Sequence, residues 1–391
     1  MIEAVEDAVA KSGLTYGMVG GGAGSFVGDV HRKAIGFDRS ALLKAGCFSK
    51  DPQNTLKTGM ALGLDTERLY NSPEIMAQEE GRRADPIDFV VIVTPNVAHF
   101  ATAKAFLNQG IPVVCEKPLT FEVWQAEELQ ALAKAKGLLF CVAYAYTGYP
   151  AVKQAKALVA SGALGELRFV NAEYPQEWLA GPLETTGQKQ AAWRSDPAQA
   201  GKSNCVGDIG SHMENLVAYI TGLKIERLCA RLDTNIPGRL LDDNATIMVD
   251  YQGGAKGVYW SSQIAVGHDN GLKVRIYGSK GSLEWSQETP NTFHFRPVDR
   301  PAETWSRGRD AFARHAQAFS RIPSGHPEGY NEAFANMYVT FCQALSAVKA
   351  GKVPSEDDLD FPTAHEGVEG VRFIGKCVES SKLGSSWVSL T

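Results

Sequence analysis

Leu14-Thr-Tyr-Gly-Met-Val-Gly-Gly-Gly-Ala-Gly24 is a short apolar run that passes directly into a glycine-rich turn. Glycines after a strand let the backbone turn tightly and approach a pyrophosphate, and the next helix offers its N-terminal N–H groups to the anion. Gly20 and Gly22 fit a G-x-G-x-x-G pattern, but its third small residue is either Ser25 or, after a three-residue insertion, Gly28. The turn therefore predicts a dinucleotide-binding loop, with an ordinary turn as the alternative.

Strands and helices alternate from this turn to about residue 145. Segments expected to be helices start near Phe26 and cover Val97–Gln109 and Val123–Lys136. Short apolar runs, expected to be strands, lie between them at Leu42–Ser49, Ile87–Val93, Ile111–Cys115 and Leu138–Ala143. This alternation is typical of an α/β domain with a parallel, doubly wound sheet.

The second half of the chain changes character after an expected helix at Val152–Ser161. Short β-rich segments follow at Leu167–Glu173, Ile225–Asp233, Ala245–Tyr251, Gly257–Gln263, Leu272–Tyr277 and Ser282–Trp285. Glycine-containing turns separate the later segments, which favours a largely antiparallel sheet. Helices are expected again at Glu332–Lys349 and Ala364–Ser380.

Length and composition limit the possible classes of protein. A chain of 391 residues is too long for one core, so we expect two domains, 1–147 and 148–391, with the final segment of the second packing back toward the first. It is 44% hydrophobic and 21% charged with a net charge of −5, which is ordinary for a soluble globular protein and does not indicate nucleic-acid binding. No apolar stretch approaches the roughly 20 residues of a membrane span.

The cysteines and the N-terminus indicate the cellular compartment. Seven scattered cysteines include no CxxC pair. Met1–Ala10 is acidic and lacks the basic start and long apolar centre of a secretory signal. We therefore expect reduced thiols in a cytoplasmic protein, rather than disulfides or a zinc framework.

The end of the second expected strand bears on the choice of cofactor. An acid about twenty residues beyond the glycine loop usually binds the ribose hydroxyls of NAD. Ser49 occupies that place here, and Lys50 next to it would neutralise the 2′-phosphate of NADP. In the alternative interpretation Lys50 is a solvated surface residue and Asp51 caps a turn before Pro52. The sequence thus leaves NAD and NADP open.

Two further motifs carry the chemistry of a hydride transfer. Glu116-Lys117-Pro118 follows a buried apolar run, and Asp208-Ile-Gly-Ser-His212 lies about ninety residues later. When a secondary alcohol loses a hydride to nicotinamide, the protein must accept the hydroxyl proton and stabilise alkoxide character. His212 is suited to the proton, Lys117 donates a hydrogen bond to the oxygen, and Asp208, four residues before His212, shares its helix face. The alternative for Asp208 and His212 is a surface pair, which the neighbouring glycines make a poor fit.

These motifs resemble the glucose–fructose oxidoreductase and inositol dehydrogenase (Gfo/Idh/MocA) family. The resemblance rests on Gly20-x-Gly22, Thr94-Pro-Asn96 with His99, Cys115-Glu-Lys-Pro-Leu119 and Gly207-Asp-Ile-Gly-Ser-His212, and it continues through Asp242-Asp-Asn-Ala245 to the C-terminal tail. It implies an N-terminal Rossmann domain, a cis bond before Pro118, and a C-terminal α/β domain with an open sheet that binds substrate and forms homodimer or homotetramer contacts. The long glycine loop and Ser49 in place of the acid depart from the family pattern.

The motifs and the resemblance together predict which residues form the site. The cofactor is expected to contact Gly20, Gly22, Ser25, Phe26, Ser49, Lys50, Thr94, Pro95, Asn96, His99, Glu116 and Lys117; for His99 the alternative is that it caps or packs the helix. The substrate, a cyclic sugar or polyol, is expected to contact Lys117, Tyr146, Trp193, Arg194, His212 and His326; the alternatives are a core position for Tyr146 and a loop anchor for Trp193 and Arg194. His326 stands in a loop, Gly325 to Tyr330, that is expected to reach over the pocket.

Five further histidines show no pattern that indicates a role in the site. No partner pattern surrounds His31, His268, His294, His315 and His365, so we expect them to serve structure or the surface. No cluster has metal-ligand spacing, so no metal is expected.

We expect a cytoplasmic NAD(P)-dependent dehydrogenase. A glycoside-cleaving enzyme that oxidises transiently, or a non-catalytic dinucleotide-binding regulator, is the alternative.

Overall fold

The structure is a computed structural model that describes residues 13–355 and 357–390. The chain forms two compact units. The first contains the chain up to Gly148 and also Tyr330–Val368, and the second contains Tyr149–Gly329 and the chain from Glu369 onward. A segment that lies late in the sequence thus belongs to the first unit.

The first unit is built on a parallel sheet that has five strands among the described residues, in the order β2-β1-β3-β4-β5. The strands are β1 (Thr15–Gly20), β2 (Leu42–Cys47), β3 (Phe89–Val93), β4 (Val113–Cys115) and β5 (Phe140–Val142). The strand order reverses between β1 and β3. In open parallel sheets this reversal marks the crevice where ligands bind, at the carboxyl ends of the strands.

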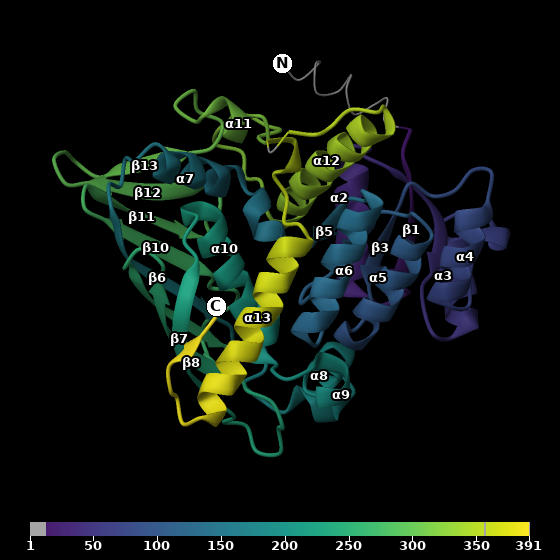
Figure 1. The fold of residues 1–391 in the computed structure, drawn as a ribbon, viewed down its shortest axis with the longest axis horizontal. Coiled ribbons are helices and arrows are strands. Elements are labelled where there is room, and N and C mark those ends of the chain that lie inside the picture. The colour runs from purple at the N-terminus through teal and green to yellow at the C-terminus, as the bar shows by residue number, and fades with distance from the viewer. Residues whose placement is uncertain (1–12, 356, 391) are drawn as a thin grey trace. The chain divides into compact units, whose positions relative to one another are not determined.

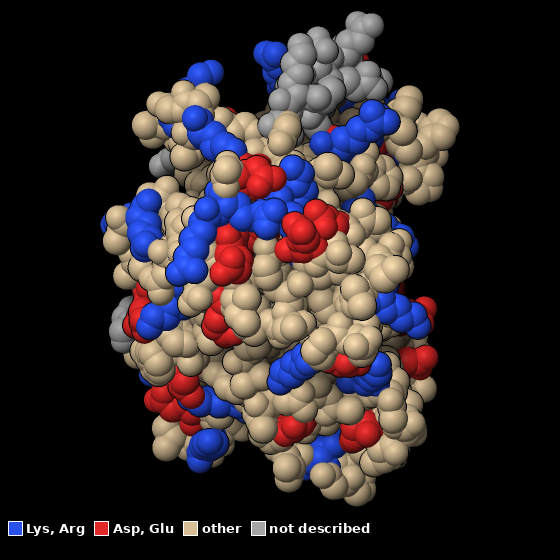
Figure 2. Space-filling view, turned by 90° about the vertical axis from the view of Figure 1, so that its right-hand side faces the viewer, with Lys and Arg blue, Asp and Glu red and all other residues tan. Residues whose placement is uncertain are grey.

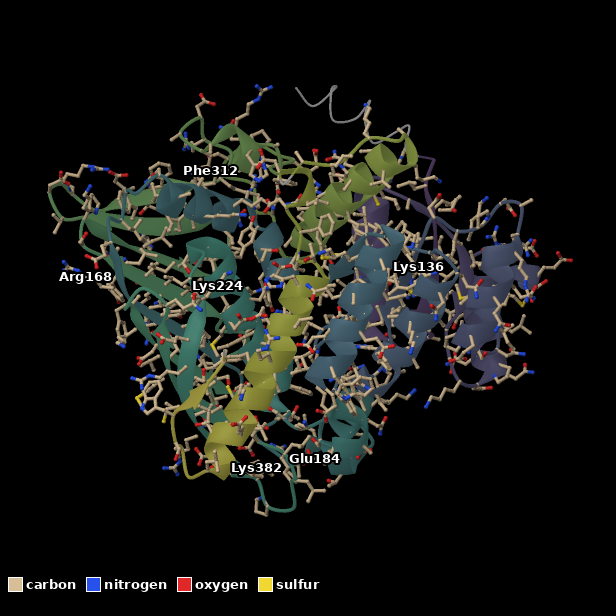
Figure 3. All side chains as sticks on the ribbon, in the orientation of Figure 1. Lys136, Arg168, Glu184, Lys224, Phe312 and Lys382 are labelled. Carbon is tan, nitrogen blue, oxygen red and sulfur yellow. The ribbon has the colours of Figure 1, made fainter. Side chains whose placement is uncertain are left out.

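Helices cover this sheet (Figure 1). They are α2 (Phe26–Phe37), α3 (Pro52–Ala61), α4 (Pro73–Arg82), α5 (His99–Asn108), α6 (Val123–Lys136) and α12 (Tyr330–Lys349), with short 3₁₀ turns at Thr66–Arg68, Asn96–Ala98, Ala145–Gly148 and Asp357–Leu359. Helix α12 packs on α2, while α5 packs between α4 and α6 and against β3 and β4. At the end of α6, Lys136 donates a hydrogen bond to the carbonyl oxygen of Asn108 at 3.0 Å (Figure 3).

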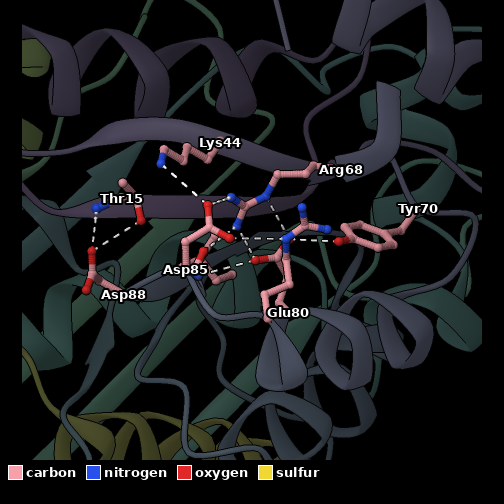
Figure 4. Close-up of polar contacts among 9 residues, drawn as sticks. Thr15, Lys44, Arg68, Tyr70, Glu80, Asp85 and Asp88 are labelled. Carbon is pink, nitrogen blue, oxygen red and sulfur yellow. Dashed lines mark hydrogen bonds and ion pairs between the residues drawn. The ribbon is translucent and has the colours of Figure 1, made fainter. Parts of the chain in front are cut away.

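A buried ion pair also stabilises the first unit (Figure 4). Glu80 on α4 is 0% exposed and accepts hydrogen bonds from the guanidinium of Arg68 at both carboxylate oxygens. Its other donors are the hydroxyl of Tyr70 at 2.8 Å and the backbone N–H of Ile87 at 3.2 Å. Asp85 accepts from the same guanidinium at 3.0 Å. A charge buried in this way is tolerated because all its acceptor positions are used.

The second unit is built on a sheet that has nine strands among the described residues, in the order β13-β12-β11-β10-β6-β9-β8-β7-β14. The strands are β6 (Leu167–Pro175), β7 (Ile225–Asp233), β8 (Asn244–Tyr251), β9 (Lys256–Ser262), β10 (Lys273–Gly278), β11 (Gly281–Ser286), β12 (Thr292–Pro297), β13 (Glu303–Ser306) and β14 (Val388–Ser389). All neighbours pair antiparallel except β6 and β9. Buried and less buried residues alternate along β11, as expected for a strand with one face on a core.

The helices of the second unit are α7 (Pro150–Ala160), α8 (Lys189–Arg194), α9 (Pro197–Ala200), a π-helical turn at Val206–Gly210, α10 (Ser211–Thr221) and α11 (Arg314–Gln317), with a 3₁₀ turn at Leu183–Thr186. Helix α13 (Ala364–Lys382) starts in the first unit and continues into the second. Helix α10 packs against α7 and β6. Among the residues that the structure describes, no helix is long and apolar enough to cross a membrane.

The predicted fold class is confirmed, with differences in detail. The alternation of strand and helix gives the parallel sheet, and the six predicted β-segments of the second half become β6 to β11. Strands β12, β13 and β14 were not expected. On the face drawn in Figure 2, basic and acidic side chains lie among one another beside a broad uncharged area, in agreement with the interspersed charges of the sequence.

Candidate active site

The glycine loop between β1 and α2 is shaped by close backbone contacts. Gly20 and Gly21 have φ of +82° and +73°, a conformation that glycine adopts without strain. A Cβ on Gly22 would lie 2.9 Å from the carbonyl oxygen of Phe48, and one on Gly28 would lie 2.4 Å from the Cα of Gly21. Gly28 is therefore the third glycine of the pattern, since it lets α2 approach the loop.

Ser25 has another role, as the N-cap of α2. Its hydroxyl accepts a hydrogen bond from the N–H of Gly28 at 3.2 Å. The first N–H groups of a helix have no acceptor within the helix, so those of Phe26 and Val27 are suited to an anion. The side chain of Phe26 is 63% exposed. A loop of close-packed glycines followed by a helix N-terminus fits the pyrophosphate of a dinucleotide.

The end of β2 continues into a tight turn before α3. The N–H of Ser49 donates to the hydroxyl of Thr55 at 3.0 Å, and the Ser49 hydroxyl accepts from the N–H of Asp51 at 3.1 Å. Asp51 is the N-cap of α3 and accepts from the N–H of Gln53 at 3.0 Å. Lys50 is exposed. The capping interpretation of Asp51 is thus correct, and Ser49 and Lys50 remain the candidates for contact with the ribose.

His99 links the two loops that follow β3 and β4. Its ring is 0% exposed, with Nε2 2.9 Å from the carbonyl oxygen of Thr94 and Nδ1 3.0 Å from that of Pro118. Burial lowers the pKa of His99, although both carbonyls act in the opposite direction. Both ring nitrogens therefore face the protein backbone. Pro95 and Asn96 lie between Thr94 and His99, where they begin the 3₁₀ turn before α5.

The loop after β4 contains Glu116, Lys117 and Pro118. The Lys117–Pro118 bond is cis, as the family resemblance implied. The carboxylate of Glu116 lies 2.8 Å from Nε2 of His31 and also accepts from the N–H of Lys117. His31 is buried on α2 and bonded to an acid, so a surface role for it is excluded. The contact joins residues 85 positions apart, and no local pattern in the sequence indicated it.

In the second unit, the segment with Asp208 and His212 is helical. Asp208 lies in the π-helical turn, and His212 is the second residue of α10. Oδ2 of Asp208 accepts from the side-chain amide of Gln263 at 3.0 Å and forms an ion pair with Nε of Arg194 at 3.1 Å. The ring of Tyr174 lies 6.3 Å from that of His212. π-Helical turns occur often at functional sites.

Asp242 anchors the start of this segment and was not predicted as a functional residue. Its buried carboxylate accepts hydrogen bonds from the hydroxyl of Ser203 and from the N–H groups of Asn204 and Val206, each at 3.0 Å. Burial raises the pKa of Asp242 against the effect of these donors. Three donors to one carboxylate determine where the π-helical turn begins.

Arg194 and Trp193 form part of the same surroundings. The Arg194 guanidinium lies 4.2 Å from the ring of Trp193 and 5.9 Å from that of Trp178. Its Nη1 donates to the side-chain oxygen of Gln190 at 2.6 Å. The sequence suggested that Arg194 binds substrate hydroxyls or anchors a loop. In the structure the guanidinium forms an ion pair with Asp208 and lies over the rings of Trp193 and Trp178.

The other two predicted substrate residues lie in different surroundings. In the first unit, Tyr146 is 6% exposed, and its ring lies 6.2 Å from that of Tyr330. In the second unit, His326 is exposed, and its carbonyl oxygen accepts from Arg307. Arg307 is buried and forms an ion pair with Glu328 at 2.9 Å. This pair, which the sequence did not indicate, anchors the loop that carries His326.

Comparison with known proteins then identifies the family. Residues 14–144 match the oxidoreductase family with an NAD-binding Rossmann fold, and residues 152–284 match the GFO/IDH/MocA C-terminal domain. The chain belongs to the GFO/IDH/MocA family. It is therefore an oxidoreductase with an NAD-binding Rossmann domain, as its glycine loop and strand order suggest.

Several known proteins resemble the chain along nearly its whole length. YfiI, an uncharacterized oxidoreductase of Bacillus subtilis (strain 168), is 36% identical over 381 residues, with 96% of each chain covered. An inositol dehydrogenase homolog of Azotobacter vinelandii, solved with NADH and myo-inositol, has a TM-score of 0.90 at 37% identity, with 98% of each chain covered. Levoglucosan dehydrogenase with NADH and levoglucosan has a TM-score of 0.83 at 25% identity, covering 97% of this chain and 99% of that chain.

No group of three or more His, Cys, Asp or Glu residues that could hold a metal ion occurs within residues 13–355 and 357–390. The seven cysteines are all buried free thiols.

Proposed function

We propose that the protein is an NAD(P)-dependent dehydrogenase that oxidises a secondary hydroxyl of a cyclic sugar or polyol. The observation that carries this proposal is the helical segment on which Asp208, held by Arg194 and Gln263, lies four residues before His212. The solved relatives bound to NADH with myo-inositol or levoglucosan support this substrate class. Lys117, after β4 of the NAD-binding unit, supplies the cationic group.

In this mechanism the nicotinamide, when bound, accepts the hydride from the carbon that carries the hydroxyl. Lys117 donates a hydrogen bond to the hydroxyl oxygen and stabilises its negative charge as the carbon–hydrogen bond breaks. His212 takes the hydroxyl proton as a general base. Gln263 and Arg194 orient the carboxylate of Asp208, which supports the charged form of the imidazole.

The glycine loop and the N-terminus of α2 hold the pyrophosphate in this proposal, with Ser49 and Lys50 near the ribose. The match to an NAD-binding domain supports NAD, and the exposed lysine after β2 is the feature that admits NADP. Tyr146, Trp193 and His326 are proposed as further substrate contacts. A cytoplasmic homodimer or homotetramer is proposed as the working state.

The test is the absorbance of reduced cofactor, measured with NAD and with NADP against inositols, aldoses, anhydrosugars and glycosides. Net reduction with one ring class would support the dehydrogenase and select its cofactor. Tight cofactor binding without net reduction, but with glycoside cleavage, would replace it by a transiently oxidising glycosidase. Cofactor binding with neither reaction would favour a regulator.

The role of Asp208 can be tested separately with Asp208→Asn. We expect kcat to fall by about 10- to 100-fold and its pH profile to change, because the amide no longer supports a charged imidazole. Asp233→Asn is the control, since Asp233 is paired with the exposed Arg231 at 2.8 Å. An unchanged pH profile in Asp208→Asn would remove this residue from the mechanism.

A further inference from the structure

We propose that His31 is a positioning residue that sets the backbone at Lys117 through the carboxylate of Glu116. His31 lies on α2 and Glu116 directly follows β4, so both belong to the first unit. The inference rests on the proposed function insofar as Lys117 is taken to be catalytic. The claim that His31 positions the backbone of Lys117 can be tested without that assumption.

The carboxylate of Glu116 is held at both of its oxygens. Oε1 lies 2.8 Å from Nε2 of His31, and Oε2 accepts a hydrogen bond from the backbone N–H of Lys117 at 3.1 Å. Nδ1 of His31 lies 2.5 Å from the hydroxyl of Tyr338 on α12. A continuous series of polar contacts thus runs from α12 through α2 to the backbone of Lys117.

The chemistry of these groups determines which of them donates to Glu116. Burial raises the pKa of Glu116, but the hydrogen bond and charge of His31, followed by the charge of Lys117, outweigh burial and hold that pKa below its ordinary value. The carboxylate is therefore ionised near neutral pH and acts only as an acceptor. Nε2 of His31 must then carry a proton and donate to Oε1, in the neutral ring and in the charged ring alike.

The contacts are shielded from water, so each donor is hard to replace. His31 and Tyr338 are both 0% exposed, and the side chain of Glu116 is 12% exposed. A buried carboxylate that loses a donor keeps the cost of its desolvation without the bond that offset it. We expect Glu116 to turn toward another donor when His31 is removed, and to release the N–H of Lys117.

The position of His31 on α2 gives this network a link to the cofactor loop. Helix α2 begins directly after the glycine loop, and Gly28 packs on Gly21 one turn before His31. On its other side the imidazole contacts the ring of Phe334 on α12, with 5.1 Å between centroids. The side chain of His31 therefore connects α2, whose N-terminus is suited to the pyrophosphate, with the loop after β4 that contains Lys117.

The experiment compares His31→Leu with His31→Gln, which keeps a side-chain N–H near the place of Nε2. Hydrogen–deuterium exchange at residue resolution reports the Lys117 amide in the protein without added cofactor or substrate. We expect exchange at Lys117 to be about 10- to 100-fold faster in His31→Leu, because a buried hydrogen bond to a charged group is lost. We expect His31→Gln to restore most of the protection.

Tyr338→Phe and Tyr70→Phe provide a matched pair in case His31→Leu folds poorly. Each removes one buried tyrosine hydroxyl in the first unit, the first from His31 and the second from Glu80. We expect exchange at Lys117 to rise in Tyr338→Phe and to stay at the wild-type rate in Tyr70→Phe. Equal exchange in the two variants would overturn the positioning role.

Kinetics with the substrate found in the cofactor assay then test whether the position of Lys117 affects turnover. We expect kcat to fall about 10- to 100-fold in His31→Leu and to recover in His31→Gln, with cofactor affinity nearly unchanged. Faster exchange at Lys117 with wild-type kcat would overturn the link to catalysis. Failure of His31→Gln to restore protection would show that packing, rather than the N–H donor, acts on Lys117. If the wild-type protein oxidises no ring alcohol, the proposed function fails, and the exchange data still decide whether His31 positions Lys117.

Discussion

Glu80, which is 0% exposed, and Glu116, whose side chain is 12% exposed, are two carboxylates of the first unit with different kinds of partner. Glu80 accepts four hydrogen bonds, two of them from the guanidinium of Arg68, which carries its charge at every ordinary pH (Figure 4). Glu116 is held by the imidazole of His31 and by the N–H of Lys117. Both acids are satisfied, but Glu80 ties α4 to the 3₁₀ turn at Thr66–Arg68 and to the segment just before β3, whereas Glu116 borders the proposed catalytic lysine.

The partners of a desolvated carboxylate distinguish one that serves only the structure from one that serves a site. Desolvation is costly for either carboxylate, so both need donors. The surroundings of Glu80 would be complete without any ligand. The surroundings of Glu116 include the backbone of Lys117, which follows β4 at the edge of the sheet where ligands of parallel sheets bind. The comparison therefore predicts a loss of stability for one network and a loss of turnover for the other.

The largest expected effect lies at the residue that the Glu116 network serves. We expect Lys117→Ala to lower kcat by about 10³-fold, in the range of a lost proton-handling group, while cofactor affinity stays within about threefold. His212→Ala should behave in the same way. Steady-state kinetics and cofactor titration measure both quantities. Wild-type turnover in either variant would refute the assignment.

The next effect lies in the Glu80 network and should appear only as stability. We expect Arg68→Leu to lower the free energy of unfolding by about 3–5 kcal/mol, because it leaves a buried carboxylate without its cation. The Arg68 side chain is 5% exposed, so solvent screens this loss little. Urea unfolding measures the change, and kcat per folded molecule should remain at the wild-type value. A fall in kcat comparable to that of His31→Leu would end the distinction between the two networks.

A smaller effect concerns the pH dependence of the stability that Glu116 contributes. A glutamate whose pKa is below its ordinary value of 4.5 stabilises the folded state above that pH and loses this contribution as the pH falls through the folded-state pKa. We expect Glu116→Gln to be less stable than the wild type at pH 7 and to lose less stability below about pH 4.5. Urea unfolding between pH 3 and pH 7 tests this. Parallel curves for the two proteins would contradict the lowered pKa.

The smallest effect comes from the two tyrosine hydroxyls. Tyr70→Phe and Tyr338→Phe should each reduce stability by about 1 kcal/mol, the usual value of one buried hydrogen bond. We expect only Tyr338→Phe to lower kcat, by a few-fold, because its hydroxyl contacts His31. Thermal unfolding and kinetics on the pair give both quantities. A lower kcat in Tyr70→Phe would place Glu80 in the same functional network as Glu116.

Much of the fold, and the candidate residues of the site, could be predicted from local patterns. The apolar run before the glycines, the alternation of strands with helices and the Glu-Lys-Pro triplet each lie within a few residues, so their spacing could be interpreted directly. The choice between Ser25 and Gly28 could not be made in this way. It depended on the 2.4 Å approach of a Cβ on Gly28 to Gly21, which appears only when helix and loop are folded. The ion pair between Arg194 and Asp208 likewise depended on folding, since the two residues are 14 positions apart.

Local patterns in the sequence were enough to predict the parallel first sheet, the mainly antiparallel second sheet and the family to which the chain belongs. Those properties depend on hydrophobic periodicity and short motifs, which act between near neighbours in the chain. The folded structure was needed to show that Tyr330–Val368 are the late residues that belong to the first unit, that Asp242 anchors the π-helical turn, and that His31 meets Glu116 and Tyr338. His31 and Tyr338 are 307 positions apart, and burial rather than local spacing selects such partners, because a polar group removed from water must find its hydrogen bonds wherever the folded chain offers them.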